Sequence, residues 1–525
     1  MTAGLRAVLA SKGGRQKACL SSGSFVLEQA NRHVATAIVD QNTPDLSVGL
    51  ETSLPPSVHV GRGVAIPIAG WCYSNAGTLF DLAIVAGDRK FDVSTHSWAR
   101  PDVLRNQCPR LDYTGNSLMS GFHSLLPIRP VAEPVNLPVS LRAKIKSGVV
   151  VERALGTMRL LPGTGAEPTQ VEWPTCGPRI VICMTTFDPP VDLFEGQIRS
   201  LQAQTHRNWI CIVCDDGSPA PVFEELYKRL SADKRFYIYQ NTNRLGFYYN
   251  FENSMKRVPS DADFVGLCDQ DDLWHPTKLE VLLANFDQST QLVYSDARIV
   301  RRDGQVISNT FWRTRGNNYT NLSSLIVANT ITGAASMFRV SLVADLLPFP
   351  KPIADGFHDH WIALTALTKG KVKYVDKALY DYIQHSTNVI GHTYGTVPGL
   401  MWIARRFVRA IRRHDSRDFI ASAVETAAAN YPLVRQKVLL ARNLLIRFPD
   451  APPRRRATLG RFARLERSVL VALYEKLLAT VYQRPTLNLE ALLLYAVIAV
   501  KLRNAASRIS KKRLVLQRRA PVFHL

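Results

Sequence analysis

The chain has 525 residues, of which 46% are hydrophobic and 21% are charged; this composition excludes a wholly disordered protein and allows about two to four domains. The net charge is +22, and residues 401–525 hold 26 Lys and Arg against 7 Asp and Glu, an excess of +19 in the last quarter. Such an excess is typical of a segment that contacts a polyanion, either anionic lipid or nucleic acid.

The first 165 residues divide into a leader and a β-rich domain. Residues 1–53 are weakly patterned and contain no long apolar run, so we expect a poorly ordered leader with one short helix and no signal peptide. Residues 54–165 contain short runs of β-formers, such as 63–74 and 79–87, separated by Gly, Asn, Asp and Pro. This spacing predicts a small antiparallel β-sandwich as an accessory domain.

Residues 176–395 have alternating strand and helix patterns. The predicted strands are 179–187, 208–214, 236–240, 263–268 and 291–295, with helical patterns between them. This succession predicts a Rossmann-like α/β domain with a mostly parallel sheet and helices on both faces. Ligands of such sheets bind beyond the carboxyl ends of the strands.

Residues 396–525 predict a basic α-helical region that associates with a membrane. Apolar side chains recur at helical spacing and arginines lie off that stripe: Phe462, Leu465, Val469, Leu473 and Leu477 against Arg461, Arg464 and Arg467. The pattern predicts one amphipathic helix with a cationic face. The apolar run Ala491–Val500 is too short for the roughly 20 residues that span a bilayer.

Two of the eight cysteines, Cys211 and Cys214, have C-x-x-C spacing within an apolar, β-branched run. In a strand their side chains point to opposite faces, and no second pair follows at zinc spacing. The preferred interpretation is therefore buried free thiols in a reducing cytoplasm.

Acidic clusters lie at three places in the α/β region: DDGS at 215–218, DQDD at 269–272 and GFHDHW at 356–361. Each cluster alone is explained as a turn or a helix cap. Acidic loops at several strand ends of one sheet would converge on one edge, which favours a functional site.

The DQDD cluster contains an acid-x-acid triplet, Asp269-Gln270-Asp271. In an extended segment residues two apart point the same way, so both carboxylates can address one point. A divalent cation that binds a nucleotide diphosphate needs one or two carboxylates and completes its shell with phosphate oxygens. Asp272 points the other way and is expected to cap the following helix.

Seven motifs occur in order over about 215 residues: RIVICMTTFDPP, CDDGS, NRLGFYYNFENSM, CDQDDLWHPTKLE, ITGAASMFR, HDHW and YIQHSTNVIGH. Together they resemble the inverting family-two glycosyltransferases with the GT-A fold, and most nearly the bacterial rhamnosyltransferase-like members. The combination is specific, whereas DDGS alone is weak. Only the middle of the chain is covered.

The resemblance implies a donor site at the first two strand ends. Thr185 and Phe187, after the first strand, and Asp216, after the second, would hold the base and ribose of a nucleotide sugar. Arg244 and Asn250, in and after the NRLGF segment, would also approach the nucleotide.

The resemblance also implies a metal site and a base. Asp269 would contact the ribose or the metal, Asp271 would bind a manganese or magnesium ion, and Asp359 matches the catalytic base. Inversion needs two acids, because one carboxylate takes the acceptor proton while the metal neutralises the departing diphosphate. His385 matches a further metal ligand of some relatives; a purely structural hydrogen bond stays an equal alternative.

Other residues near the base have competing interpretations. His358 and His360 flank Asp359, and such histidines are more often structural than catalytic; Asp355 could cap the following helix. Asp359 is preferred because Trp361 follows at the family's spacing.

Trp274 and Trp361 could stack on acceptor sugars, with plain core packing as the alternative. The small residues in Ile331–Phe338 would let backbone approach a ligand or, alternatively, let elements pack closely.

The predicted function is inverting, metal-dependent transfer of a sugar from a nucleotide-sugar donor to a cell-envelope glycan or lipid-linked acceptor. dTDP-L-rhamnose is the first donor candidate, and a galactofuranose or other hexose donor is the alternative. A different class, a catalytically inactive glycan- or membrane-binding module, is disfavoured because Asp269, Asp271 and Asp359 are all present.

We expect a cytoplasmic protein that lies peripherally on the inner face of the membrane, with an anionic lipid surface as partner. No nucleic-acid partner is expected, because the basic segment lacks the aromatic interleaving of a single-strand binder. The pattern does not decide between a monomer and an oligomer.

Overall fold

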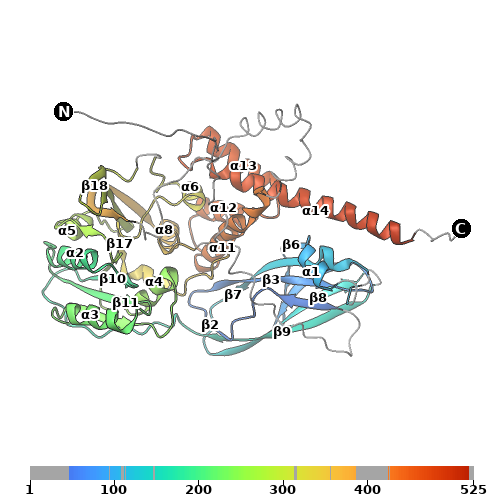
Figure 1. Cartoon of the computed structure of the whole chain (residues 1–525), viewed down its shortest axis with the longest axis horizontal. Helices are drawn as coiled ribbons and strands as arrows, with labels where there is room; N and C mark the ends of the chain where they lie inside the picture. The colour runs from blue at the N-terminus through green and yellow to red at the C-terminus, as the bar shows by residue number, and fades with distance from the viewer. Residues whose placement is uncertain are drawn as a thin grey trace, which may run out of the picture.

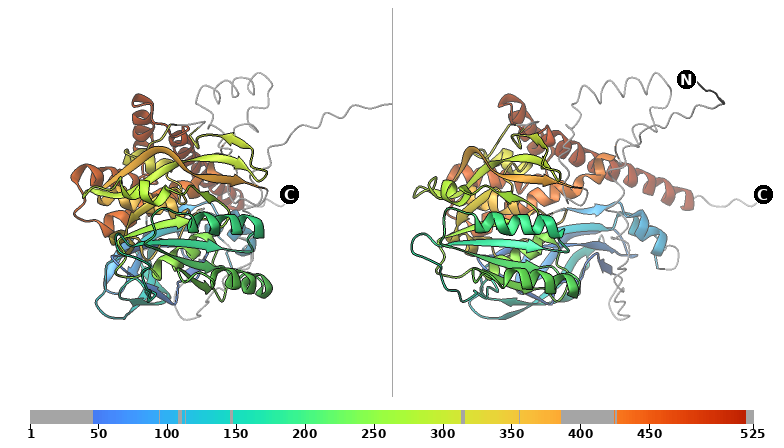
Figure 2. Two further views of the ribbon diagram at one scale, coloured as in Figure 1. Left: turned by 90° about the vertical axis from the view of Figure 1, so that its left-hand side faces the viewer. Right: turned by 60° about the vertical axis from the view of Figure 1, so that its left-hand side comes forward.

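The computed structural model describes residues 46–93, 95–107, 111–112, 114–145, 148–312, 316–354, 356–385, 424 and 426–519. Nearly all of the predicted leader, Asp355 and residues 386–423 thus lie outside the described residues. Figure 1 shows three parts, namely a pair of β-sheets, an α/β domain and a group of C-terminal helices. The two further views in Figure 2 show the same arrangement.

Two sheets make up the β-rich part. The first has the order β1 (Ser47–Leu50), β3 (Val64–Tyr73), β7 (Gly121–Ile128) and β6 (Thr95–Trp98). The second has the order β2 (Ser57–His59), β9 (Val150–Leu161), β8 (Val135–Ile145), β4 (Leu79–Ala86) and β5 (Arg89–Asp92). Between β6 and β7 lie α1 (Pro101–Gln107) and the 3-10 turn η1 (Asn116–Met119).

Both sheets contribute to one apolar core. In β8, buried Val139, Leu141, Ala143 and Ile145 alternate with more exposed residues, as expected for a strand with one covered face. The strand pairs are antiparallel except β2 with β9. Strand β1 lies within the predicted leader and pairs with β3, so the β-rich part begins at Ser47 instead of residue 54.

The α/β domain is built on a nine-stranded sheet. Its order is β12 (Phe236–Gln240), β11 (Trp209–Asp215), β10 (Ile180–Thr186), β13 (Phe264–Cys268), β17 (Ser336–Arg339), β15 (Thr290–Arg301), β18 (Lys371–Gln384) and β14 (Leu273–Trp274), with β16 (Val306–Ser308) on β15. Its helices are α2 (Val191–Gln202), α3 (Ala220–Leu230), α4 (Phe247–Lys256), α5 (Lys278–Leu283), α6 (Leu322–Val327), the 3-10 turn η2 (Val340–Leu342), α7 (Val343–Leu346) and α8 (His358–Lys369).

The prediction of a mostly parallel sheet is only half right. Strands β12, β11, β10 and β13 are parallel, but β17 runs antiparallel to β13 and to β15, and β14 runs antiparallel to β18. Strands β10, β11 and β13 are buried on both faces, which is why they read as continuous apolar runs in the sequence, whereas the edge strand β12 is only partly buried. Cys211 and Cys214 are buried free thiols within β11.

The C-terminal helices are α11 (Tyr431–Arg447), α12 (Pro453–Phe462), α13 (Val469–Val481) and α14 (Leu489–Arg519). The single amphipathic helix predicted around residues 461–477 is therefore wrong. Helix α12 ends at Phe462, and Ser468 caps α13 by accepting a hydrogen bond from the Val471 amide. Among the helices that the structure describes, none has a stretch both long and apolar enough to cross a membrane.

Helix α11 joins the β-rich part to the α/β domain. Its last residue, Arg447, is 3% exposed, and its guanidinium donates hydrogen bonds to the carbonyls of Gly63, Asp345, Leu346 and Pro348. One buried side chain thus ties a loop of the β-rich part to the segment around α7. Burial lowers the pKa of Arg447 to about 10.

Candidate active site

The carboxyl ends of β10, β11 and β13 lie side by side on one edge of the sheet. The strands are parallel, and Thr186 is in register with Asp215 while Met184 is in register with Cys268. The loops that follow, with Phe187, Asp216 and the DQDD cluster, are therefore neighbours. This is the edge at which ligands of parallel sheets bind.

The acids of the DDGS loop are fully engaged by the protein. Asp215 is buried and accepts hydrogen bonds from Thr186 and from the amide and hydroxyl of Ser218. Asp216 is 3% exposed and accepts from the Leu245 and Gly246 amides at 2.7 and 2.8 Å. Asp216 therefore holds the NRLG segment at the start of α4.

Asn250 supports the same segment from inside. It is 1% exposed, donates to the Cys214 carbonyl at 2.8 Å and accepts from the Asn241 amide group at 2.9 Å. The Asn241 amide group also donates to Asp216. Asp216 and Asn250 thus shape the predicted donor loop from beneath and do not present free polar groups to a ligand.

The more accessible donor-loop residues are Thr185, Phe187 and Arg244. The Arg244 guanidinium lies 3.7 Å from the centre of the Phe187 ring, a cation–π contact. Gln270 fixes this loop, because its side-chain oxygen accepts from the Phe187 amide at 2.8 Å. The middle residue of the D-Q-D triplet therefore ties the first strand-end loop to the third.

The acids of the DQDD cluster differ from those of DDGS. Burial, together with the charges of Asp271 and Asp359, raises the pKa of Asp269 to about 7. The Asp271 carboxylate lies 2.9 Å from Nε2 of His385, and its pKa is also raised, chiefly by burial, although His385 opposes the shift. The sequence-predicted metal residues Asp271 and His385 thus lie in direct contact.

Asp272 does not cap a helix, contrary to expectation. Helix α5 begins at Lys278 after Thr277, whereas Asp272 is 1% exposed and lies near the Ile383 backbone and Lys278. Burial raises its pKa well above the usual range. The prediction of a helix cap is wrong because several residues separate Asp272 from the first residue of α5.

A buried lysine beneath the triplet was missed by sequence reasoning. Lys278 is 0% exposed, its ammonium lies 3.4 Å from the centre of the Trp274 ring, and it donates to the Ala334 carbonyl. Burial lowers its pKa to about 7, while Cys268, Asp272 and Asp269 oppose the shift. The only signal was its place in the motif CDQDDLWHPTKLE.

Asp359 lies in the first turn of α8, about ninety positions along the chain from the triplet. Its carboxylate accepts from the His360 amide at 2.5 Å and is also hydrogen-bonded by the Gly333 backbone and the Asn329 side chain. Burial raises its pKa to about 7 despite these bonds. The charge of Asp359 also contributes to the raised pKa of Asp269, so the two carboxyl groups interact electrostatically.

The histidines beside Asp359 have structural partners. His360 contacts the Leu325 carbonyl at 2.7 Å, and the His358 ring stacks on Phe251 with centroids 3.8 Å apart. Burial lowers the pKa of His358 to about 3, so the ring is neutral near pH 7. A Cβ on Gly333 would lie 2.7 Å from the His358 ring, so the small residues of 331–338 here allow close packing.

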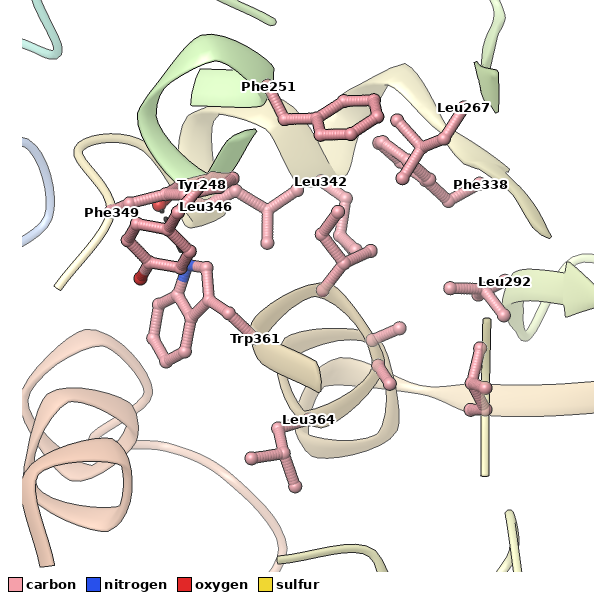
Figure 3. Close-up of a cluster of buried hydrophobic side chains, with 14 of the residues drawn as sticks. Tyr248, Phe251, Leu267, Leu292, Phe338, Leu342, Leu346, Phe349, Trp361 and Leu364 are labelled. Atoms are coloured by element: carbon pink, nitrogen blue, oxygen red, sulfur yellow. Dashed lines mark hydrogen bonds between the residues drawn. The ribbon is translucent and has the colours of Figure 1, made fainter. Parts of the chain in front are cut away.

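The two tryptophans expected to contact an acceptor are core residues. Trp361 is 0% exposed, donates to the Leu346 carbonyl at 3.0 Å and lies among Tyr248, Leu346 and Phe349 (Figure 3). Trp274 is 3% exposed beneath Lys278. Neither ring offers a face to a sugar, so the structure contradicts acceptor stacking and favours the core alternative.

The residues present fit a metal that is shared with a substrate. Within the described part of the chain, no group of three or more His, Cys, Asp and Glu side chains is arranged to hold an ion alone. Asp271 and His385 provide two donors beside the desolvated Asp269. Two protein donors suit a divalent ion whose remaining ligands are diphosphate oxygens and water.

Residues 182–347 match the family described as Glycosyl transferase family 2. No curated protein matches the chain. The match marks a glycosyltransferase domain with a GT-A-like fold and a curled, mixed sheet, and the chain is a glycosyltransferase.

Similar solved structures share low sequence identity with the chain. S. aureus TarS 1–349 has a TM-score of 0.36 and 14% identity, and the match covers 63% of this chain and 92% of that one. The Pyrobaculum calidifontis mannosyltransferase PcManGT in complex with GDP-Man and Mn2+ has a TM-score of 0.33 and 17% identity, with coverage of 65% and 90%.

Proposed function

We propose that this glycosyltransferase inverts the anomeric centre and uses a divalent metal to transfer a sugar from a nucleotide to a cell-envelope glycan or lipid-linked acceptor. One observation carries the proposal. Asp269, in the loop after β13, and Asp359, in the first turn of α8, are distant in sequence, yet the charge of Asp359 contributes to the raised pKa of Asp269. The DQDD loop is suited to the leaving diphosphate and the start of α8 to the acceptor hydroxyl.

Asp359 is the proposed base. Single in-line displacement needs a carboxylate near the acceptor hydroxyl to accept its proton. A pKa of about 7 suits this task, because a substantial fraction of the carboxyl groups is ionised at neutral pH and the carboxylate is basic enough to take a proton. Asn329 and the Gly333 backbone hold the carboxylate in place.

Asp271 and His385 are the proposed metal ligands, with Asp269 shared between metal and ribose. A bound manganese or magnesium ion would supply charge neutralisation for the departing diphosphate. The role of the protein is to hold Asp271 in place through His385 and to keep the triplet desolvated.

The proposed donor contacts are Thr185, Phe187 and Arg244 directly, and Asp216 and Asn250 through the loop that they shape. The Phe187 ring under the Arg244 guanidinium offers an aromatic face and a cation for a nucleotide. dTDP-L-rhamnose stays the first donor candidate, with galactofuranosyl or other hexosyl donors as the alternative.

The test is an assay of the purified full chain against a panel of nucleotide sugars with and without manganese or magnesium. Metal-dependent donor hydrolysis or transfer with one donor supports the proposal and identifies the sugar. Inactivity with every donor despite nucleotide binding would instead support an inactive binding module. An Asp271→Ala variant with unchanged metal dependence would contradict the metal assignment.

We also propose peripheral association with the inner face of the cell membrane. The excess of +19 over residues 401–525 supports an anionic lipid surface as the partner. Liposome flotation tests this; equal binding to neutral and anionic vesicles would remove the electrostatic basis.

A further inference from the structure

Helix α13 carries a continuous apolar face that none of the residues described by the structure covers. Five side chains share this face and are 40–75% exposed: Leu470, Leu473, Tyr474, Leu477 and Val481. Their spacing of three or four residues places them on one side of the helix. Tyr482, 68% exposed, follows at the end of the helix.

The opposite side of α13 is the one that folding uses. Ala472, Glu475 and Ala479 are buried there, and α13 packs against α14. Glu475 receives hydrogen bonds from Arg461 and Arg484. The helix is therefore fixed by its inner side, and its apolar outer side adds nothing to the core.

The segment that carries this face has exposed charge of one sign. Between Pro453 and Arg519 the sequence holds 16 Lys and Arg and only three acids, Glu466, Glu475 and Glu490. All three acids are buried, at 2–4% exposed. Exposed charge on the described side chains of this segment is therefore positive, and includes Arg464, Arg467 and Lys501.

We infer that the outer face of α13 docks into the interface of an anionic lipid bilayer. Its Leu and Val side chains would enter the acyl boundary, Tyr474 and Tyr482 would lie at headgroup level, and the flanking cations would contact acidic headgroups. A second copy of this face is disfavoured as occupant, because it would bring like charges together. The inference deepens the proposed localisation and does not depend on the transfer chemistry.

The surface differs from the one that the sequence pattern suggested. Phe462 and Leu465 of the predicted stripe are 0% and 1% exposed, so they cannot enter lipid. Leu470 and Val481, which lie outside that stripe, are 75% and 72% exposed. The break at residues 463–468 turns a different side of the chain outward.

The test is flotation of the full chain with vesicles of phosphatidylcholine alone and of phosphatidylcholine mixed with phosphatidylglycerol. The wild type should float with the mixed vesicles. A variant with Leu470→Ser, Leu477→Ser and Val481→Ser should partition at least about tenfold less. The matched control carries Phe80→Ser, Tyr227→Ser and Val306→Ser, which remove exposed apolar groups elsewhere, and should float like the wild type.

A second variant separates the charge contribution. Arg464→Gln, Arg467→Gln and Lys501→Gln should weaken binding to mixed vesicles by about fivefold per charge while leaving the apolar face intact. Wild-type flotation by the triple serine variant would overturn the inference. Conversion of a lipid-free oligomer to a monomer by the same variant, measured by sedimentation, would assign the face to a second copy and also overturn it.

Discussion

Two acidic loops at the same sheet edge have opposite electrostatic characters. Asp215 and Asp216 of DDGS are buried, and together they accept hydrogen bonds from five backbone or hydroxyl donors of the protein. Within the described part of the chain, Asp269 and Asp271 of DQDD lack a comparable set of backbone donors, although His385 contacts Asp271, and the pKa values of both are raised. Two similar acidic sequences therefore have different roles. The carboxylates of DDGS brace a loop through hydrogen bonds, whereas the carboxyl groups of DQDD are desolvated and have raised pKa values.

The difference shows that the role of an acidic residue at the end of a strand depends on how many hydrogen-bond donors surround its carboxylate. A carboxylate that receives backbone amides is neutralised by the fold and shapes a loop. A desolvated carboxylate beside other carboxylates gains most from a bound cation. The following predictions test this contrast, from the largest expected effect to the smallest.

Removing the proposed base should have the largest effect. Asp359→Asn keeps the size and loses the proton acceptor, so we expect kcat to fall by about 10²–10⁴-fold. Steady-state kinetics with the identified donor measures this, and the exposed Asp450→Asn is the control. Transfer at the wild-type rate would remove Asp359 from catalysis.

The pH dependence follows from the same carboxyl groups. The pKa of Asp359 and that of Asp269 are both raised to about 7, so these groups become protonated as pH falls below that value. A base must be ionised, so kcat/KM should decline by about tenfold per pH unit on the acid side. The profile reports the coupled pair, and a flat profile down to about pH 5 would contradict the assignment.

Weakening the metal site should have an intermediate effect. Asp271→Asn keeps a hydrogen-bond partner for His385 but removes a negative charge, so the metal concentration for half-maximal activity should rise by at least about tenfold. Removing metal with a chelator should abolish activity, and added manganese or magnesium should restore it. Equal metal dependence in wild type and variant would contradict the proposal that the DQDD loop, unlike the DDGS loop, binds the metal.

The brace in the DDGS loop should respond differently. Asp216→Asn turns an amide group toward one of two backbone donors, so the NRLG segment should loosen and stability should fall by about 1–3 kcal/mol. Donor KM should rise while metal dependence stays unchanged. The control, Asp192→Asn, removes an exposed ion pair with Arg302 and should cost less than about 1 kcal/mol.

The sequence predicted the elements whose patterns are local. Strand β12 was placed at its observed bounds, because its apolar pattern is encoded locally. The antiparallel pairing of β17 was not predictable, since pairing direction depends on long-range packing. The break before α13 was missed because Phe462 and Leu465 keep helical spacing across it.

The sequence predicted which residues belong to the candidate site, but not their contacts or charge states. The D-x-D spacing identified Asp269 and Asp271, and the contact between Asp271 and His385 brings together residues 114 positions apart. The charge state of the site depends on how deeply its carboxyl groups are buried by elements such as α8 and α5. This burial arises from tertiary packing and cannot be read from a local sequence pattern. Lys278, Asn329 and Arg447 were missed for the same reason, because their partners are distant in the chain.

Trp361 offers the smallest activity effect and a direct test of the core assignment. Trp361→Phe removes the hydrogen bond to the Leu346 carbonyl and part of the ring beneath Arg447, so the free energy of unfolding should fall by about 1–3 kcal/mol. The acceptor KM should stay within about twofold, because no sugar reaches a fully buried ring. Trp173→Phe, which loses a bond to the half-exposed Asp261 and weakens a cation–π contact with Arg179, is the control and should cost less. Unchanged stability with a raised acceptor KM would instead restore the role in acceptor binding.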